Sequence, residues 1–180
     1  LPTTDKARLR ALDAAFEIAS EEGVEKLAFS QPILEELKLV KMKFEHALKH
    51  YEADATVQTK KSRDYKTAFA KAQLYVGHFI QVIYLTIERG ELKEEALQHY
   101  GLESLKGKIP SLNSEYELIE WGNRIIAGEQ KRKEKGGSPI YNPSIALVKV
   151  NVENFREAAI FQATLKRNTI RTYEKLKNVR

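Results

Sequence analysis

The sequence predicts an all-α protein, an antiparallel up-and-down bundle of four to five long helices plus one short helix. Three observations support this fold class. Apolar residues recur every three to four positions through most of the 180 residues. The nine Gly and five Pro gather at a few places, which leaves long uninterrupted segments between them. No segment alternates apolar and polar residues as a half-buried strand would. The expected organisation is a single domain over 1–180, because short connections make successive helices antiparallel neighbours.

The first two helices are located by their capping residues and their apolar spacing. Thr4 can cap a helix that ends near Gly23, where a left-handed residue would stop it. Ser30 offers the next cap, with Pro32 in the first turn of a second helix. The apolar stripe of that helix consists of Ile33, Leu37, Val40, Phe44, Ala47 and Tyr51. The pattern fades over 52–63, which predicts a turn there although this segment has no Gly or Pro.

A third long helix is expected over 64–89, and Gly90 stops it. Its core-facing positions are Tyr65, Phe69, Ala72, Val76, Phe79, Ile83 and Thr86. A short helix over 92–99 follows and is closed by Gly101.

The fourth and fifth long helices have the clearest start signals. Ser114 followed by Glu117 predicts a capping box, and the stripe behind it is Leu118, Trp121, Gly122 and Ile125. The Gly- and Pro-containing segment 136–143 predicts a connection, with Asn142 capping the last helix and Pro143 at its first position. That helix is expected over about 143–178, roughly 50 Å long, and could project from the bundle. Its stripe weakens after Ala159, which indicates loose packing or a partner.

Composition excludes several classes of function. The chain has no Cys, so disulfides, thiolate metal sites and cysteine nucleophiles are absent. The most apolar run, 74–87, contains His78 and Gln81 and is shorter than the roughly 20 residues that cross a bilayer. No transmembrane segment is therefore expected. The start of the chain lacks a basic and then apolar signal pattern, and a cytoplasmic location is favoured.

His46 and His50 are the candidate metal ligands, because histidines four positions apart lie over one another on a helix. With Phe44 as the core direction, they point to about 200° and 240°, towards solvent. Metal sites in bundle cores place their ligands inward, and no His here has Glu three positions before it. The sequence therefore favours exposed histidines over a functional metal site, and no cofactor is expected.

His78 is expected at the edge of the core, where a partly buried imidazole could act as a general base. No nucleophile or orienting carboxylate can be assigned to it from sequence. The chain also lacks the Gly-x-Ser-x-Gly and His-Glu-x-x-His motifs. An enzymatic activity is therefore not favoured.

Positive charge gathers at the end of the chain. Residues 131–180 contain 12 Lys and Arg against 4 Asp and Glu, whereas residues 1–130 contain 18 against 21. One basic cluster is Lys131, Arg132, Lys133 and Lys135, and a second occupies the last helix. The candidate contacts to an anion or nucleic acid are Lys166, Arg167, Arg171 and Lys175. Basic residues at helix C-termini also complement the helix dipole, which is a structural alternative.

Residues 11–24, Ala-Leu-Asp-Ala-Ala-Phe-Glu-Ile-Ala-Ser-Glu-Glu-Gly-Val, resemble the opening helix of tetracycline-repressor-type regulators. In that family a short helix, a Gly-containing turn and a recognition helix follow. Here Ser30-Gln31-Pro32 leads into one long amphipathic helix. The resemblance covers fewer than twenty residues, and DNA binding is not carried over from it.

Two functions from different classes follow. The first is a non-enzymatic helical-bundle scaffold or protein-interaction module, acting through a protein partner or through self-association. The alternative is binding of an anion or a nucleic acid through the basic C-terminal helix, with nucleic acid as the less favoured partner.

Overall fold

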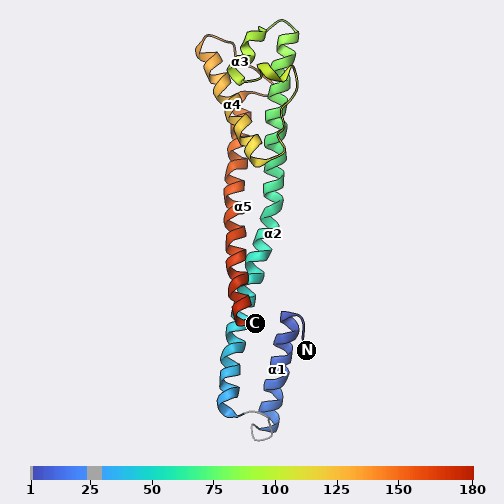
Figure 1. The fold of residues 1–180 in the computed structure, drawn as a ribbon, viewed down its shortest axis with the longest axis vertical. Helices are drawn as coiled ribbons and strands as arrows, with labels where there is room; N and C mark the ends of the chain where they lie inside the picture. The colour runs from blue at the N-terminus through green and yellow to red at the C-terminus, as the bar shows by residue number, and fades with distance from the viewer. Residues whose placement is uncertain (1, 24–29) are drawn as a thin grey trace. The chain divides into compact units, whose positions relative to one another are not determined.

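The computed structural model describes residues 2–23 and 30–180 (Figure 1). Its helices are α1 (Asp5–Glu22), α2 (Gln31–Glu88), η2 (Glu94–Ala96), α3 (Leu97–Tyr100), η3 (Glu103–Leu105), α4 (Glu115–Glu134) and α5 (Ile145–Val179). The described ranges contain no strand. The all-α bundle is confirmed, with four long α-helices and one short one within these ranges. None of the helices in these ranges is both long enough and apolar enough to span a bilayer.

Several helix ends lie where capping chemistry places them. The Thr4 hydroxyl accepts a hydrogen bond from the Ala7 amide at 3.2 Å, and α1 ends before Gly23, whose φ is 78°. The capping box of α4 is complete: the Ser114 hydroxyl accepts from the Glu117 amide at 3.2 Å, and the Glu117 carboxylate accepts from the Ser114 amide at 3.1 Å. These bonds satisfy amides that lack partners in the first helical turn.

The turn predicted over 52–63 is wrong, because α2 continues through it from Gln31 to Glu88. Every residue in this stretch can adopt helical backbone angles. The hydroxyls of Thr56 and Thr59 bond to carbonyls four residues earlier, at 2.7 and 2.9 Å. The apolar stripe fades here because one buried cluster ends near Tyr51 and the next begins near Tyr65. The apolar stripe is therefore absent where α2 contributes to neither core, whereas the backbone hydrogen bonds of the helix continue.

The predicted start of the last helix is also wrong. Asn142 has a φ of 56° and precedes a cis peptide bond to Pro143, so it does not have the extended conformation of an N-cap. The helix begins at Ile145 instead. The Ser144 hydroxyl accepts from the Leu147 amide at 3.4 Å, which gives Ser144 the capping role. The length of the helix, 35 residues, agrees with the prediction.

Contacts divide the described residues into two compact units. Unit 1 comprises those within 1–60 and 164–180, and unit 2 comprises 61–163. Both α2 and α5 contribute residues to each unit. The single domain expected from sequence stays a prediction.

Unit 1 has a small core. Phe44 and Leu48 of α2 and Leu176 of α5 are buried, and Leu9 and Leu12 of α1 pack against them. At the rim, the Arg180 guanidinium bonds to the Asp5 carboxylate at 2.6 Å. The hydrophobic face of α1 is therefore covered by the two longer helices.

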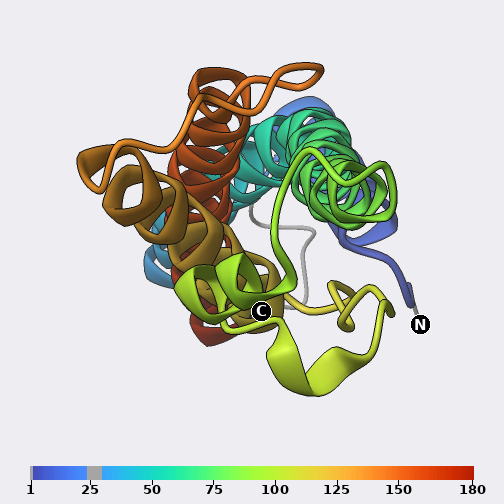
Figure 2. The same cartoon turned by 90° about the horizontal axis from the view of Figure 1, so that it is seen from above.

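Unit 2 holds the larger core, formed by α2, α3, α4 and α5. Figure 1 shows α4 running in the same direction as α2, because the segment 101–114 returns the chain before α4 begins, and α5 running antiparallel to both. Figure 2 shows these three helices from above. Gly122 lets α4 approach α5 closely, since an added Cβ would lie 2.8 Å from Val152 Cγ2. The members with no exposed surface include Ala72, Val76, Phe79, Ile80, Ile83, Leu102, Leu118, Ile125, Val148, Val152 and Phe155.

Candidate functional site

A charged pair is buried on the core face of α4. Glu129 is 0% exposed and Arg132 is 6% exposed. The two side chains meet through two parallel bonds: Arg132 Nη2 donates to Glu129 Oε1 at 2.9 Å, and Arg132 Nε donates to Glu129 Oε2 at 3.0 Å. Bidentate pairing of this kind fixes the plane of the guanidinium as well as its position.

Tyr100 at the end of α3 joins this pair. Its hydroxyl donates to Glu129 Oε2 at 2.5 Å and accepts from Arg132 Nε at 2.7 Å. Burial, reinforced by the hydrogen bond to Glu129, raises the pKa of Tyr100 far above its ordinary value, so the phenol stays a donor. The close approach depends on Gly128, where an added Cβ would lie 2.7 Å from Tyr100 Cδ1 and 2.9 Å from the His99 carbonyl carbon.

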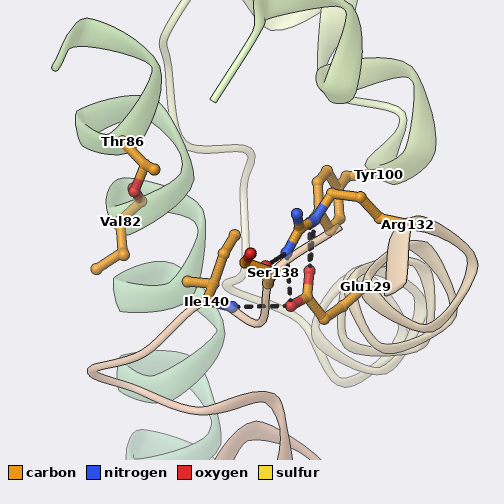
Figure 3. Close-up of polar contacts among 7 residues, drawn as sticks. All are labelled: Val82, Thr86, Tyr100, Glu129, Arg132, Ser138 and Ile140. Carbon is orange, nitrogen blue, oxygen red and sulfur yellow. Dashed lines mark hydrogen bonds and ion pairs between the residues drawn. The ribbon is translucent and has the colours of Figure 1, made fainter. Parts of the chain in front are cut away.

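The connection between α4 and α5 closes over the same pair (Figure 3). Arg132 Nη2 donates to the Ser138 carbonyl at 2.5 Å, and the Ile140 amide donates to Glu129 Oε1 at 3.0 Å. Ile140 is itself buried. We call Tyr100, Glu129, Arg132, Ser138 and Ile140 the Glu129 network. Desolvation alone would lower the pKa of Arg132, but its bonds to Glu129 and Tyr100 outweigh that effect and the pKa is raised.

A cavity of about 660 Å³ lies beside the Glu129 network, within unit 2. Figure 3 shows Val82 and Thr86 of α2 near Ser138 and Ile140, which line it with them. Its basic lining residues are Arg89, Lys93, His99, Arg132 and Lys135, and its acidic one is Glu91. Its apolar lining residues are Val82, Leu92, Ala96, Pro139 and Ile140. The cavity thus combines an apolar surface with an excess of positive charge.

Arg132 contributes to the cavity although it is buried. The bonds within the network use Nε and Nη2. The third nitrogen of the guanidinium, Nη1, lies beside Gly137, which lines the cavity. A Cβ added at Gly137 would be 2.6 Å from this nitrogen. Arg89 pairs with Glu91 at 3.2 Å, so this pair contributes little net charge. Arg132 is likewise paired with Glu129, so the net positive charge of the lining, which can attract an anionic oxygen, comes mainly from Lys93 and Lys135.

The two histidines predicted as weak metal ligands are both exposed and lie in unit 1. His46 Nε2 and His50 Nε2 are 3.1 Å apart. Within the ranges that the structure describes, no group of three or more His, Asp or Glu side chains is placed to hold a metal ion.

His78 does not occupy the position expected for a general base. Its side chain is exposed, so the prediction of a partly buried imidazole is wrong. His78 lies one position before the fully buried Phe79, and the rotation of about 100° between successive helical residues turns it outward. The cavity is lined by His99 and not by His78.

The two basic clusters behave differently. In the first, Arg132 is buried in the Glu129 network and is therefore not part of an exposed basic surface. In the second, the four candidate anion contacts are all exposed in unit 1: Lys166, Arg167, Arg171 and Lys175. Arg167, Arg171 and Lys175 are spaced four apart and share one face of α5.

Glu129 and Tyr100 were not identified from sequence. A signal for Glu129 existed, because the stripe through Leu118, Gly122 and Ile125 reaches Glu129 and then Arg132 when it is continued at the same spacing. An opposite-charge pair at core positions indicates a buried ion pair. Tyr100 carries no comparable signal, since its partners are 29 and 32 residues away.

No protein-family model, curated protein or solved structure matches this chain.

Proposed function

We propose that the protein is a non-enzymatic binding module and that the cavity of unit 2 takes a small organic anion. The observation that carries this proposal is the placement of Arg132. A buried guanidinium, fixed by Glu129 and Tyr100, stands at a cavity whose other charged groups are mostly cationic. A fixed cation costs little conformational entropy when it binds a ligand.

The arrangement favours binding over catalysis. The Glu129 carboxylate accepts four hydrogen bonds, from Tyr100, from Ile140 and twice from Arg132. A carboxylate engaged in this way positions its neighbours and is poorly suited to transfer protons. The raised pKa of Tyr100 likewise suits a permanent donor more than a general base. Both groups therefore act as support for Arg132.

The shape and chemistry of the cavity favour a ligand with two parts. Its volume lies within the roughly 300–1,000 Å³ of small-molecule sites. Anionic oxygens would lie near Arg132 and Lys135, and an apolar part would lie against Val82 and Ile140. Phosphate and carboxylate groups share the required chemistry.

Phenyl phosphate should bind the full chain at least about tenfold more tightly than inorganic phosphate, because its ring buries apolar surface worth more than about 1.4 kcal/mol. Replacing the cavity residues Arg89, Lys93 and Lys135 together with Ala should raise its dissociation constant by at least about tenfold. Isothermal titration calorimetry checks both expectations.

The matched control removes three charges elsewhere, through Arg167→Ala, Arg171→Ala and Lys175→Ala on α5. This variant should bind phenyl phosphate as the native chain does. Equal losses in the two triple variants would show a general charge effect and would reject the cavity site, as would the absence of binding to the native chain.

A second candidate function, binding of a nucleic acid by α5, rests on the row formed by Arg167, Arg171 and Lys175. Their exposure and shared face give a compact line of positive charge, with Lys166 beside it. Neutralising phosphates releases counterions, so the affinity of such a site depends steeply on salt concentration.

The test of this candidate is the salt dependence of binding to a short DNA duplex, followed by fluorescence anisotropy. Alanine at Lys166, Arg167, Arg171 and Lys175 should remove the slope of log affinity against log salt, which is about −0.9 per neutralised phosphate. The cavity variant should keep the slope. A slope unchanged in the α5 variant would discard the candidate.

A further inference from the structure

The exposed histidine pair on α2 has the spacing of a metal chelate. His46 Nε2 and His50 Nε2 lie 3.1 Å apart, with ring centroids 4.3 Å apart. Two nitrogens bound to one tetrahedral zinc ion, at about 2.0–2.1 Å each, lie about 3.3 Å from one another. The pair can therefore chelate a divalent transition metal with almost no movement, once each ring carries its proton on Nδ1.

One chain supplies only these two ligands, whereas zinc prefers four. Within the described residues no third His, Asp or Glu is grouped with the pair. A second copy of the chain would add two more imidazoles, provided that its α2 can lie against this face. The exposure of both histidines, which argues against a metal site inside a bundle, is what a site shared between copies requires.

The residues around the pair are self-complementary in an antiparallel arrangement. Leu39 lies seven residues before His46, and Val57 lies seven residues after His50. At 100° per residue, Leu39, His46 and Val57 point within about 20° of one another. If His46 of one copy stands opposite His50 of the other, Leu39 therefore meets Val57. These side chains are 52% and 45% exposed, so the contact would cover apolar surface on both copies.

The charges follow the same register. Lys43 lies three residues before His46, and Asp54 lies four residues after His50, on the same edge of the helix. When a two-fold axis relates two antiparallel helices, the same edge of each helix lies on the same side of the interface. Lys43 of one copy therefore meets Asp54 of the other. Glu35 and Lys60 are matched in the same way further out. Every such contact occurs twice in the pair.

We infer that His46 and His50 form half of a transition-metal site, which the same two residues of a second copy complete when the two α2 helices lie antiparallel. The metal is bound by four imidazoles on the two-fold axis, and the ratio is one ion to two chains. This site is independent of the cavity in unit 2.

The test adds zinc chloride to the full chain, free of any affinity tag, and measures mass by sedimentation equilibrium and stoichiometry by calorimetry. The mass should double from 20.6 kDa at one zinc per two chains, and EDTA should reverse the change. His46→Ala and His50→Ala should each abolish pairing while leaving the helical circular dichroism unchanged.

Charge reversal tests the register. Lys43→Glu should weaken dimer formation about tenfold, because in each dimer two glutamates would then face Asp54 of the other copy. Asp54→Lys should weaken it to a similar extent, because two lysines would then face Lys43. The double variant Lys43→Glu with Asp54→Lys should restore it. Four results would overturn the inference: no zinc binding, one zinc bound by a single chain, a dimer indifferent to EDTA, or equal weakening in the single and double reversal variants.

Discussion

Replacing Glu129 with Ala is expected to lower the free energy of unfolding by about 3–5 kcal/mol. The substitution leaves the Arg132 guanidinium buried without its counter-charge. It also removes the acceptors of the Tyr100 hydroxyl and the Ile140 amide. Denaturant unfolding followed by circular dichroism measures the change.

Paired variants separate the charge from the packing. Glu129→Leu combined with Arg132→Met should cost less than Glu129→Ala alone, because an apolar pair of similar size needs no counter-charge. Glu129→Gln should give an intermediate loss, since its amide keeps one acceptor oxygen. A loss below about 1 kcal/mol in Glu129→Ala would contradict the structural role assigned to the Glu129 network.

Substituting two glycines with Ala should change stability in opposite directions. Gly128→Ala is expected to cost about 2 kcal/mol or more, because the new methyl group meets the His99 backbone and the Tyr100 ring and forces α3 away from α4. Gly77→Ala should add about 0.5–1 kcal/mol, because Ala favours the helix and the nearest atom, Leu112 Cδ1, would be 3.8 Å away. Thermal and denaturant unfolding of the two variants provide the comparison.

Each of these variants is the other's control, since both place the same methyl group within a long helix. Gly128→Ala should also weaken phenyl phosphate binding, because Tyr100 and Arg132 would lose their positions. Stabilisation by Gly128→Ala would show that α3 does not pack against α4 as closely as described.

The parts of the fold that could be predicted are those fixed by neighbouring residues. The N-caps and glycine stops depend on contacts within three or four positions, so Thr4, Ser114 and Gly90 could be interpreted directly. The continuity of α2 through 52–63 could not, because the apolar pattern reports on packing and this stretch lies between two cores. The sequence alone could not reject Asn142 as the cap, because only the structure shows its φ of 56°; Ser144 caps the helix instead.

The candidate site was harder to predict than the fold because two distant stretches of the chain build it. Its lining comes from 82–99 and 132–142, which meet only once the chain has folded. Arg132 was visible as part of a basic run, but its burial depends on Tyr100 and Ser138. By contrast, the exposure of His46 and His50 follows from helical periodicity alone.

The most direct test of the proposed function observes Arg132 itself. In ¹⁵N-resolved NMR spectra of the full chain, phenyl phosphate should shift the side-chain signals of Arg132 and the amide signals of Ser138 and Ile140, with one common dissociation constant. Those of Arg167 and Arg171 on α5 should stay in place. Shifts confined to α5, with Arg132 unmoved at saturating ligand, would contradict the assignment of the cavity as the binding site.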